Sequence, residues 1–80
     1  MVRDFKAEDK SKRVVTADGD AVGTVDMAAG SSAHIAPDED LSRSIRRRLG
    51  WTEEGEETYR LDKSKVDSIT DDEVRLKGNL

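Results

Sequence analysis

The sequence predicts a mostly β fold, a small β-barrel of five to six short antiparallel strands with one short α-helix. Its 80 residues are enough for one domain and no more. Short β-branched segments alternate with turn signals at close spacing, which is typical of a small barrel. Only the stretch between Asp38 and Gly50 has both the apolar spacing and the end signals of a helix.

The N-terminal residues 1–12 are polar and rich in lysine, and only Val2 and Phe5 could anchor them. We therefore expect a flexible leader from which Phe5 docks on the domain. The folded domain itself is expected to span residues 13–78.

The first two strands are expected at residues 13–16 and 21–27. Asp18 and Gly19 lie between them and form a tight-turn signal, because glycine accepts a positive φ without penalty. The flanks are typical of strand-turn-strand, so this stretch is not a phosphate-binding loop. It also lacks the oxygen ligands that a calcium loop would need at two of its positions.

Period-two alternation predicts which side chains of the second strand are buried. Val25 and Met27 are expected on one face and Val22 on the other. Gly23 marks either a bulge or a close backbone approach. Three more strands are expected at residues 33–36, 58–61 and 73–76, and residues 63–69 suit a helical turn that leads into a strand.

The predicted helix has an apolar face whose residues recur every four positions: Leu41, Ile45 and Leu49. Asp38 or Asp40 is expected to cap its start, where negative charge is favourable. Gly50 is expected to be the left-handed residue that ends it, and Trp51 to fold back onto Ile45.

Charge and composition exclude several classes of protein. The chain has 14 Lys and Arg against 18 Asp and Glu, for a net charge of −4, which makes it a poor general binder of nucleic acid. It has no cysteine, which excludes disulfides and Cys-based zinc sites and fits a cytoplasmic location. It has no apolar run long enough to span a membrane and no secretory signal. The balance of acids and small apolar residues is typical of a protein from a halophile.

No residue pattern predicts catalysis. His34 is the only histidine, so it cannot form a multi-His metal site, and the nearby Ser31 and Ser32 lack a nucleophile pattern. Paired acids such as Glu53 and Glu54 lie in a stretch expected to be exposed, whereas a general acid needs burial. We expect no enzyme activity, no metal and no cofactor.

The concentrated positive charge of the chain lies on the predicted helix, at Arg43, Arg46 and Arg47. Three interpretations stay open: a solvated face that complements the helix dipole, docking to an acidic protein or to the glutamate loop of a second subunit, and binding to RNA or DNA. We take these three arginines and Trp51 as the candidate partner-binding residues. The thin core and open strand edges favour a homodimer.

Two stretches resemble the PRC-barrel, the small β-barrel shared by the photosynthetic reaction-centre H subunit and the ribosome maturation factor RimM. They are VVTADGDAVGTV at Val14–Val25 and VDSITDDEVRL at Val66–Leu76. The helix with IRRRLGW at Ile45–Trp51 is similar to the short, acidic, stand-alone versions found in haloarchaea.

This resemblance implies a protein-interaction module without a shared catalytic centre. It further implies a dimeric adaptor that acts in archaeal cell division, through a partner that anchors the FtsZ ring to the membrane. The alternative is an RNA- or ribosome-associated module of the RimM type, although this sequence has no counterpart of the N-terminal domain of RimM. Because fold does not fix function, the division role is an analogy.

Overall fold

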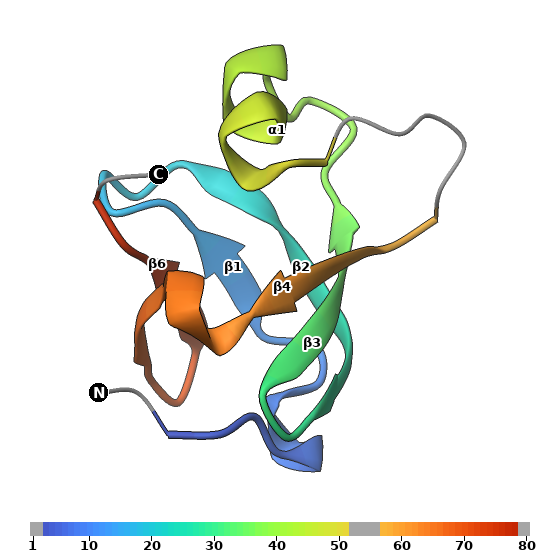
Figure 1. Ribbon diagram of the computed structural model, residues 1–80, viewed down its shortest axis with the longest axis vertical. Helices are drawn as coiled ribbons and strands as arrows, with labels where there is room; N and C mark the ends of the chain where they lie inside the picture. The colour runs from blue at the N-terminus through green and yellow to red at the C-terminus, as the bar shows by residue number, and fades with distance from the viewer. Residues whose placement is uncertain (1–2, 52–56, 79–80) are drawn as a thin grey trace.

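The computed structural model describes residues 3–51 and 57–78 (Figure 1). One six-stranded sheet, in the order β4-β3-β2-β1-β6-β5, forms the body of the molecule. In chain order the elements are η1 (Ala7–Asp9), β1 (Arg13–Val15), β2 (Ala21–Ala29), β3 (Ser32–Pro37), α1 (Arg43–Leu49), β4 (Tyr59–Asp62), η2 (Lys63–Lys65), β5 (Val66–Ile69) and β6 (Glu73–Leu76). The predicted mostly β fold with one short helix is confirmed.

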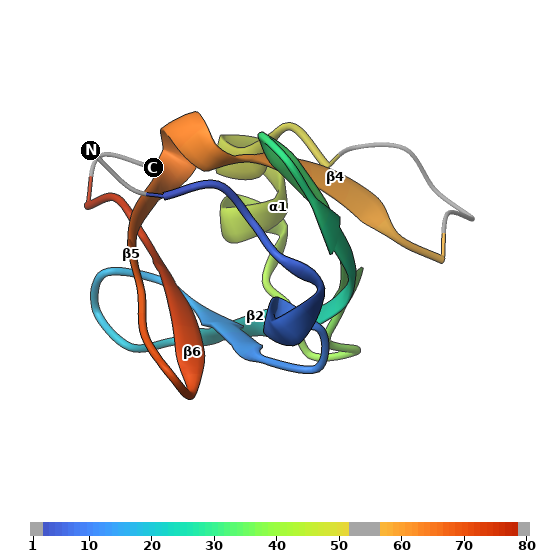
Figure 2. The ribbon, with the colours of Figure 1, turned by 90° about the horizontal axis from the view of Figure 1, so that it is seen from below.

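The sheet curls into an open half-barrel, as Figure 2 shows. β4 and β5 are its two edge strands, yet only the three residues of η2 separate them in sequence. The Cα–Cα steps from Asp62 to Val66 span at most about 15 Å. The sheet must therefore bend until its two edges approach each other, and the expected helical turn before β5 is the connection that imposes this bend.

One strand pairing differs from the antiparallel arrangement that the sequence predicts. β1 pairs with β6 in parallel, while the other four pairings are antiparallel. Short turns reverse the chain between β1 and β2, between β2 and β3 and between β5 and β6, and the longer segment that contains α1 reverses it between β3 and β4. In contrast, η2 leads from one sheet edge to the other without a reversal. The last strand therefore returns to β1 in the same direction as β1.

Two bulges in β2 change the burial pattern that simple alternation predicts. The register shifts at Val22 against β1 and at Asp26 against β3. As a result Val22 and Val25 both point into the core, while Met27 is 63% exposed. The prediction that Val25 and Met27 share a face is wrong, because an extra residue between them rotates the strand.

The two glycines singled out in this region act as the sequence predicts. Gly19 has φ +91° in the turn between β1 and β2. Gly23 passes close to β3, and a Cβ atom placed on it would lie 2.3 Å from the carbonyl oxygen of Ala36. Of the two alternatives for Gly23, the close backbone approach is confirmed, and the bulge lies at its neighbour Val22.

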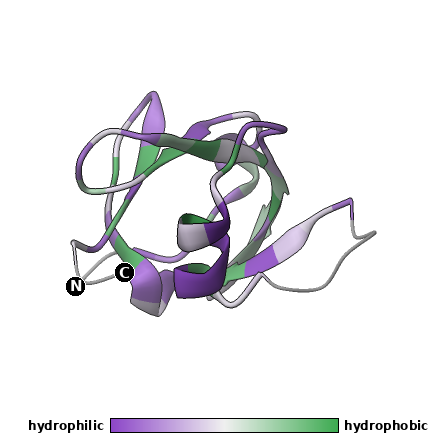
Figure 3. Ribbon diagram, turned by 90° about the horizontal axis from the view of Figure 1, so that it is seen from above, coloured by the Kyte–Doolittle hydropathy of each residue, from purple (hydrophilic) through white to green (hydrophobic). Residues whose placement is uncertain are grey.

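Helix α1 begins later than its acidic residues indicate. Asp38 lies in a turn in which its carbonyl accepts from the N–H of Leu41, at 3.1 Å. The hydroxyl of Ser42 accepts from the N–H of Ile45, so Ser42 is the N-cap, not Asp38 or Asp40. Gly50 ends the helix with φ +77°, as predicted. Figure 3 shows α1 lying over one end of the barrel.

The N-terminal segment covers the opposite end (Figure 2). Phe5 is 3% exposed and its N–H donates to the carbonyl oxygen of Gly30, so the expected docking of Phe5 is confirmed. The segment differs from a loose leader, however, because Asp9 is also fully buried and is bonded to Arg3 and Lys12. Residues 3–12 thus pack as part of the domain.

The core is one contiguous cluster that fills the barrel between these two ends. Its members are Phe5, Val14, Val22, Val25, Ala33, Ile35, Leu41, Leu49, Trp51, Tyr59, Leu61, Val66, Val74 and Leu76. Ile45 and Ile69 pack against it and are partly buried. Within the described residues, no helix is both long enough and apolar enough to cross a bilayer.

Candidate partner-binding surface

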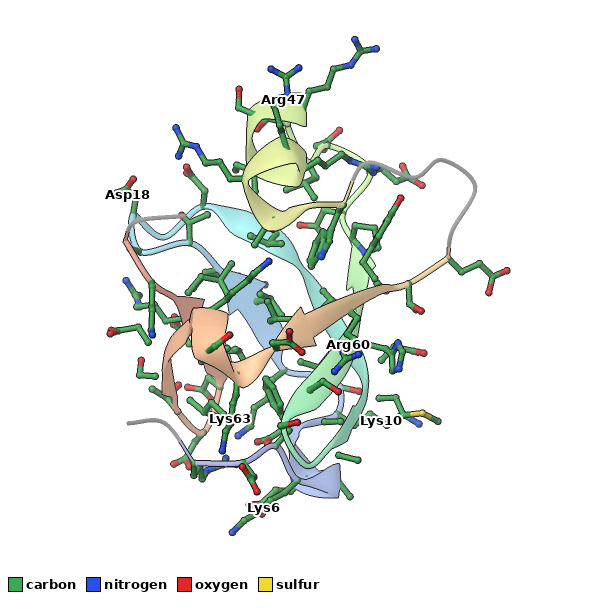
Figure 4. All side chains as sticks on the ribbon, in the orientation of Figure 1. Lys6, Lys10, Asp18, Arg47, Arg60 and Lys63 are labelled. Atoms are coloured by element: carbon green, nitrogen blue, oxygen red, sulfur yellow. The ribbon has the colours of Figure 1, made fainter. Side chains whose placement is uncertain are left out.

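Helix α1 brings the three predicted arginines together at one end of the barrel. Arg43 and Arg47 are one helical turn apart and both are exposed. Figure 4 shows Arg47 at the outer end of the helix, directed away from the sheet. These two guanidinium groups are accessible to a partner, and we call the exposed face that carries them the arginine face.

Arg46 is placed differently from its two neighbours. It is half-buried, and its guanidinium carbon lies 6.0 Å from the centre of the Tyr59 ring. This distance is typical of a cation–π contact, which holds the Arg46 side chain against β4. Arg46 therefore borders the arginine face and also joins the helix to the sheet.

Trp51 is not on the surface, in contrast to its predicted role as a contact residue. It is 3% exposed, and its indole N–H donates to the carbonyl oxygen of Arg60 at 3.2 Å. The indole of Trp51 follows the helix at the edge of the sheet beside β4. Burial of this large apolar ring is favourable there, and its N–H supplies a donor to the carbonyl oxygen of Arg60. Trp51 thus joins the C-terminal end of the helix to β4 and is not itself accessible to a partner.

The C-terminal end of α1 has two further supports. The chain folds back after Gly50, so that the N–H of Trp51 donates to the carbonyl oxygen of Arg46 at 2.8 Å. The ammonium of Lys65, from η2, donates to the carbonyl oxygen of Leu49 at 3.2 Å. Sequence reasoning missed Lys65, because the contact joins elements 16 residues apart and no local pattern indicates it.

A small cleft of about 60 Å³ lies beside the helix. The turn between β1 and β2, helix α1 and the end of β6 form its walls. Ile45, Leu49 and Leu76 supply its apolar lining, and Asp18, Asp20, Arg48 and Lys77 are among its polar residues. Typical small-molecule pockets measure about 300–1,000 Å³, so this cleft suits at most one side chain.

The other residues considered for chemistry are scattered. His34 is exposed on β3 and lies opposite Arg60 in the register of β3 and β4. Over residues 3–51 and 57–78, no group of three or more His, Cys, Asp or Glu could hold a metal ion. The glutamates at 53, 54 and 56 lie outside the described residues, so the expected exposed loop there is not described.

A charge cluster that the sequence did not indicate lies at the opposite end of the barrel. The Arg3 guanidinium makes two hydrogen bonds to the Asp9 carboxylate, at 2.8 and 2.9 Å, and the Lys12 ammonium makes a third at 2.7 Å. The hydrogen bonds from Arg3 hold the pKa of Asp9 well below its ordinary value, although burial opposes them. Asp9 is thus a buried structural residue that is charged at neutral pH.

The fold and the surface define a class of small domain, a curled six-stranded sheet covered at one end by an arginine-bearing helix and at the other by its N-terminal segment. The chain belongs to a family of unknown function, DUF8593, which it matches over residues 5–76. The match includes Phe5 and Asp9 as well as the sheet. Comparison with curated proteins and with solved structures gave no match.

Proposed function

We propose that this chain is a non-catalytic interaction module that binds an acidic partner protein through the arginine face of α1. The observation that carries the proposal is the exposure of Arg43 and Arg47 on one face of a helix whose C-terminal end is bonded to β4 and η2. Fixed, exposed guanidinium groups are suited to bidentate contacts with carboxylates.

The charge distribution gives this face its selectivity. The whole chain has a net charge of −4, so the arginine face is a local positive region on an acidic molecule. An acidic partner is attracted to this region and repelled by much of the remaining surface. The orientation of the complex is therefore restricted to one end of the barrel.

The resemblance to PRC-barrels supports a more specific form of the proposal. In that form the module works in the cytoplasm of a halophilic archaeon, and its partner is a cell-division protein that anchors the FtsZ ring to the membrane. High salt screens distant charges, so binding would depend on direct guanidinium–carboxylate contacts rather than on long-range attraction.

The test is capture of partners by the tagged chain at the salt concentration of its host. The variant R43E/R47E is compared with K6E/K10E, which makes the same change in charge at exposed positions away from α1 (Figure 4). We expect R43E/R47E to lose at least about tenfold of the captured partner and K6E/K10E to retain it. Far-UV circular dichroism checks that both variants fold.

A cross-linker attached at position 47 then identifies the contacted surface of the partner. The proposal requires that surface to be acidic. Equal capture by R43E/R47E and the wild type would contradict the proposal, as would the failure of the wild type to capture any partner.

The alternative of an RNA-associated module has a specific observation against it. Binding of single-stranded RNA relies on exposed aromatic side chains on which bases stack. The chain has one Phe, one Tyr and one Trp, and Phe5, Tyr59 and Trp51 are all buried. RNA retention that falls steeply with rising salt would nevertheless favour this alternative over the first.

A further inference from the structure

The turn between η1 and β1 holds a non-glycine residue in a conformation that favours glycine. Lys10 has φ −57° and ψ 138°, Ser11 has φ +74°, and the N–H of Lys12 donates to the carbonyl oxygen of Asp9 at 3.2 Å. These values define a type II turn, whose third position normally holds glycine. Ser11 is the only non-glycine residue with positive φ in the described part of the chain.

Residues 3–9, which we call the N-terminal hook, are held in shape by their own contacts. The Asp9 carboxylate binds the Arg3 guanidinium and the backbone N–H of Lys6, all within the hook. The 3₁₀ turn Ala7–Asp9 adds a hydrogen bond from the N–H of Asp9 to the carbonyl oxygen of Lys6. The hook can therefore change position as a unit.

The contacts that join the hook to the barrel are few and lie at one end of the molecule. Phe5 is buried there, and its N–H donates to the carbonyl oxygen of Gly30 at 2.8 Å. The Lys12 ammonium reaches Asp9, and the Lys63 ammonium pairs with Asp4. Figure 2 shows the hook crossing this end of the barrel.

We propose that two copies of this chain exchange their N-terminal hooks, so that Phe5 and Asp9 of each copy close the barrel of the other. Each contact between hook and barrel is remade across the pair, which is the condition for low-cost domain swapping. Only the turn opens: Ser11 leaves its left-handed conformation, and the hydrogen bonds from Lys12 N–H to the carbonyl oxygen of Asp9 and from Ser11 N–H to that of Val25 are given up.

This inference goes beyond the proposed function because it concerns the opposite end of the barrel from the arginine face. It also gives the expected homodimer a specific mechanism. Because the exchange replaces an intramolecular contact by an intermolecular one, the swapped form is favoured as the protein concentration rises. The variant R43E/R47E should therefore leave the fraction of swapped dimer unchanged.

A disulfide trap tests the exchange directly, since the chain has no cysteine of its own. Lys6 and Ala29 are exposed and flank the antiparallel bridge between Phe5 and Gly30, so they face each other across it. The single variants K6C and A29C are mixed at high concentration, refolded together and oxidised. We expect a disulfide-linked dimer of one K6C chain with one A29C chain in the mixture, and far less disulfide-linked dimer of any kind from K6C alone or A29C alone.

Variants at the turn supply the second measurement. Proline cannot adopt φ +74° and has no N–H for Val25, so S11P penalises only the closed chain. We expect S11P to raise the yield of the mixed disulfide several-fold, S11G to lower it several-fold, and S11A to leave it unchanged. Light scattering after size exclusion should show the same order for the dimer fraction.

The proposal is overturned if the mixture of K6C and A29C yields no mixed dimer at any concentration. It is also overturned if S11G and the wild type give the same yield, which can be measured even if S11P fails to fold. Loss of partner capture with an intact mixed disulfide would count against the arginine face alone.

Discussion

Trp51 stacks on Tyr59, with the ring centroids 5.3 Å apart and the planes 14° from parallel. Trp51 directly follows the residue that ends α1, and Tyr59 is the first residue of β4. The pair therefore fastens the arginine-bearing helix to an edge strand of the sheet. The indole N–H also occupies the carbonyl oxygen of Arg60, which reduces the backbone that this edge offers to another chain.

Two substitutions of Trp51 separate the contribution of its hydrogen bond from that of its buried ring. Trp51→Phe keeps a stacked ring but loses the hydrogen bond to Arg60, so the free energy of unfolding should fall by about 1–2 kcal/mol. Trp51→Ala also opens a cavity and should cost about 3–5 kcal/mol. Urea unfolding measures both values. The exposed Arg47→Ala serves as the control and should change stability by less than about 0.5 kcal/mol.

Asp9 should be the most sensitive charged residue of the N-terminal end. Asp9→Asn removes a fully buried carboxylate and leaves Lys12 and Arg3 without their partner. Because Arg3 is about one-third exposed, we expect a loss of about 2–3 kcal/mol rather than the full cost of breaking a buried pair. Denaturant unfolding at about pH 7 measures it, and Asp4→Asn, which removes only an exposed ion pair with Lys63, should cost less than about 1 kcal/mol.

The same residue predicts a pH dependence with a definite sign. The pKa of Asp9 is lower in the folded protein than in the unfolded chain, mainly because of the hydrogen bonds from Arg3. Its contribution to stability is therefore complete above about pH 4 and declines as the pH falls further. The stability difference between the wild type and Asp9→Asn should shrink below that pH. A constant difference down to about pH 2 would contradict the assignment.

Gly23 and Gly19 form a matched pair of tests. In Gly23→Ala the new Cβ would meet the backbone of Ala36 and Pro37, at 2.3 and 2.9 Å, so β2 and β3 must separate. We expect a loss of about 3 kcal/mol or more. Gly19 has open space around it, and Gly19→Ala should cost only about 1–2 kcal/mol, from its positive φ. Thermal unfolding that ranked the two in the opposite order would refute this account.

Ser42 should contribute to the position of the arginine face. Ser42→Ala removes the hydroxyl that accepts from the N–H of Ile45, which should cost about 1 kcal/mol. Ser44→Ala, at an exposed position within the helix, should be neutral or slightly stabilising, because alanine is the better helix former. Urea unfolding of both variants distinguishes a capping residue from a merely exposed one.

Local signals in the sequence predicted the elements well. The turn at Gly19, the helix end at Gly50 and the strand at residues 73–76 depend on rules that act within a few residues, and the structure has all of them. The prediction that Asp38 or Asp40 caps the helix was wrong, because both residues lie in a turn between β3 and α1 that precedes the N-cap. Local sequence rules favour Asp and Ser alike at an N-cap, so they could not indicate which of these neighbouring residues takes that position.

Long-range features were the ones that the sequence could not indicate. The bulges at Val22 and Asp26 depend on the register of neighbouring strands, and the burial of Asp9 depends on contacts with Arg3 and Lys12. Of the predicted contact residues, Trp51 lies in the interior, where its ring stacks on that of Tyr59. The position of Arg43 and Arg47 on one exposed face followed directly from helical spacing.

The parallel pairing of β1 with β6 has a consequence for how the protein is made. The strand Arg13–Val15 pairs with Glu73–Leu76, so a central strand of the sheet lacks one neighbour until residues 73–76 have left the ribosome. Such distant pairing slows folding, and meanwhile the exposed side of β1 can pair with other nascent chains. The solubility of this small acidic protein during synthesis therefore depends on its last strand.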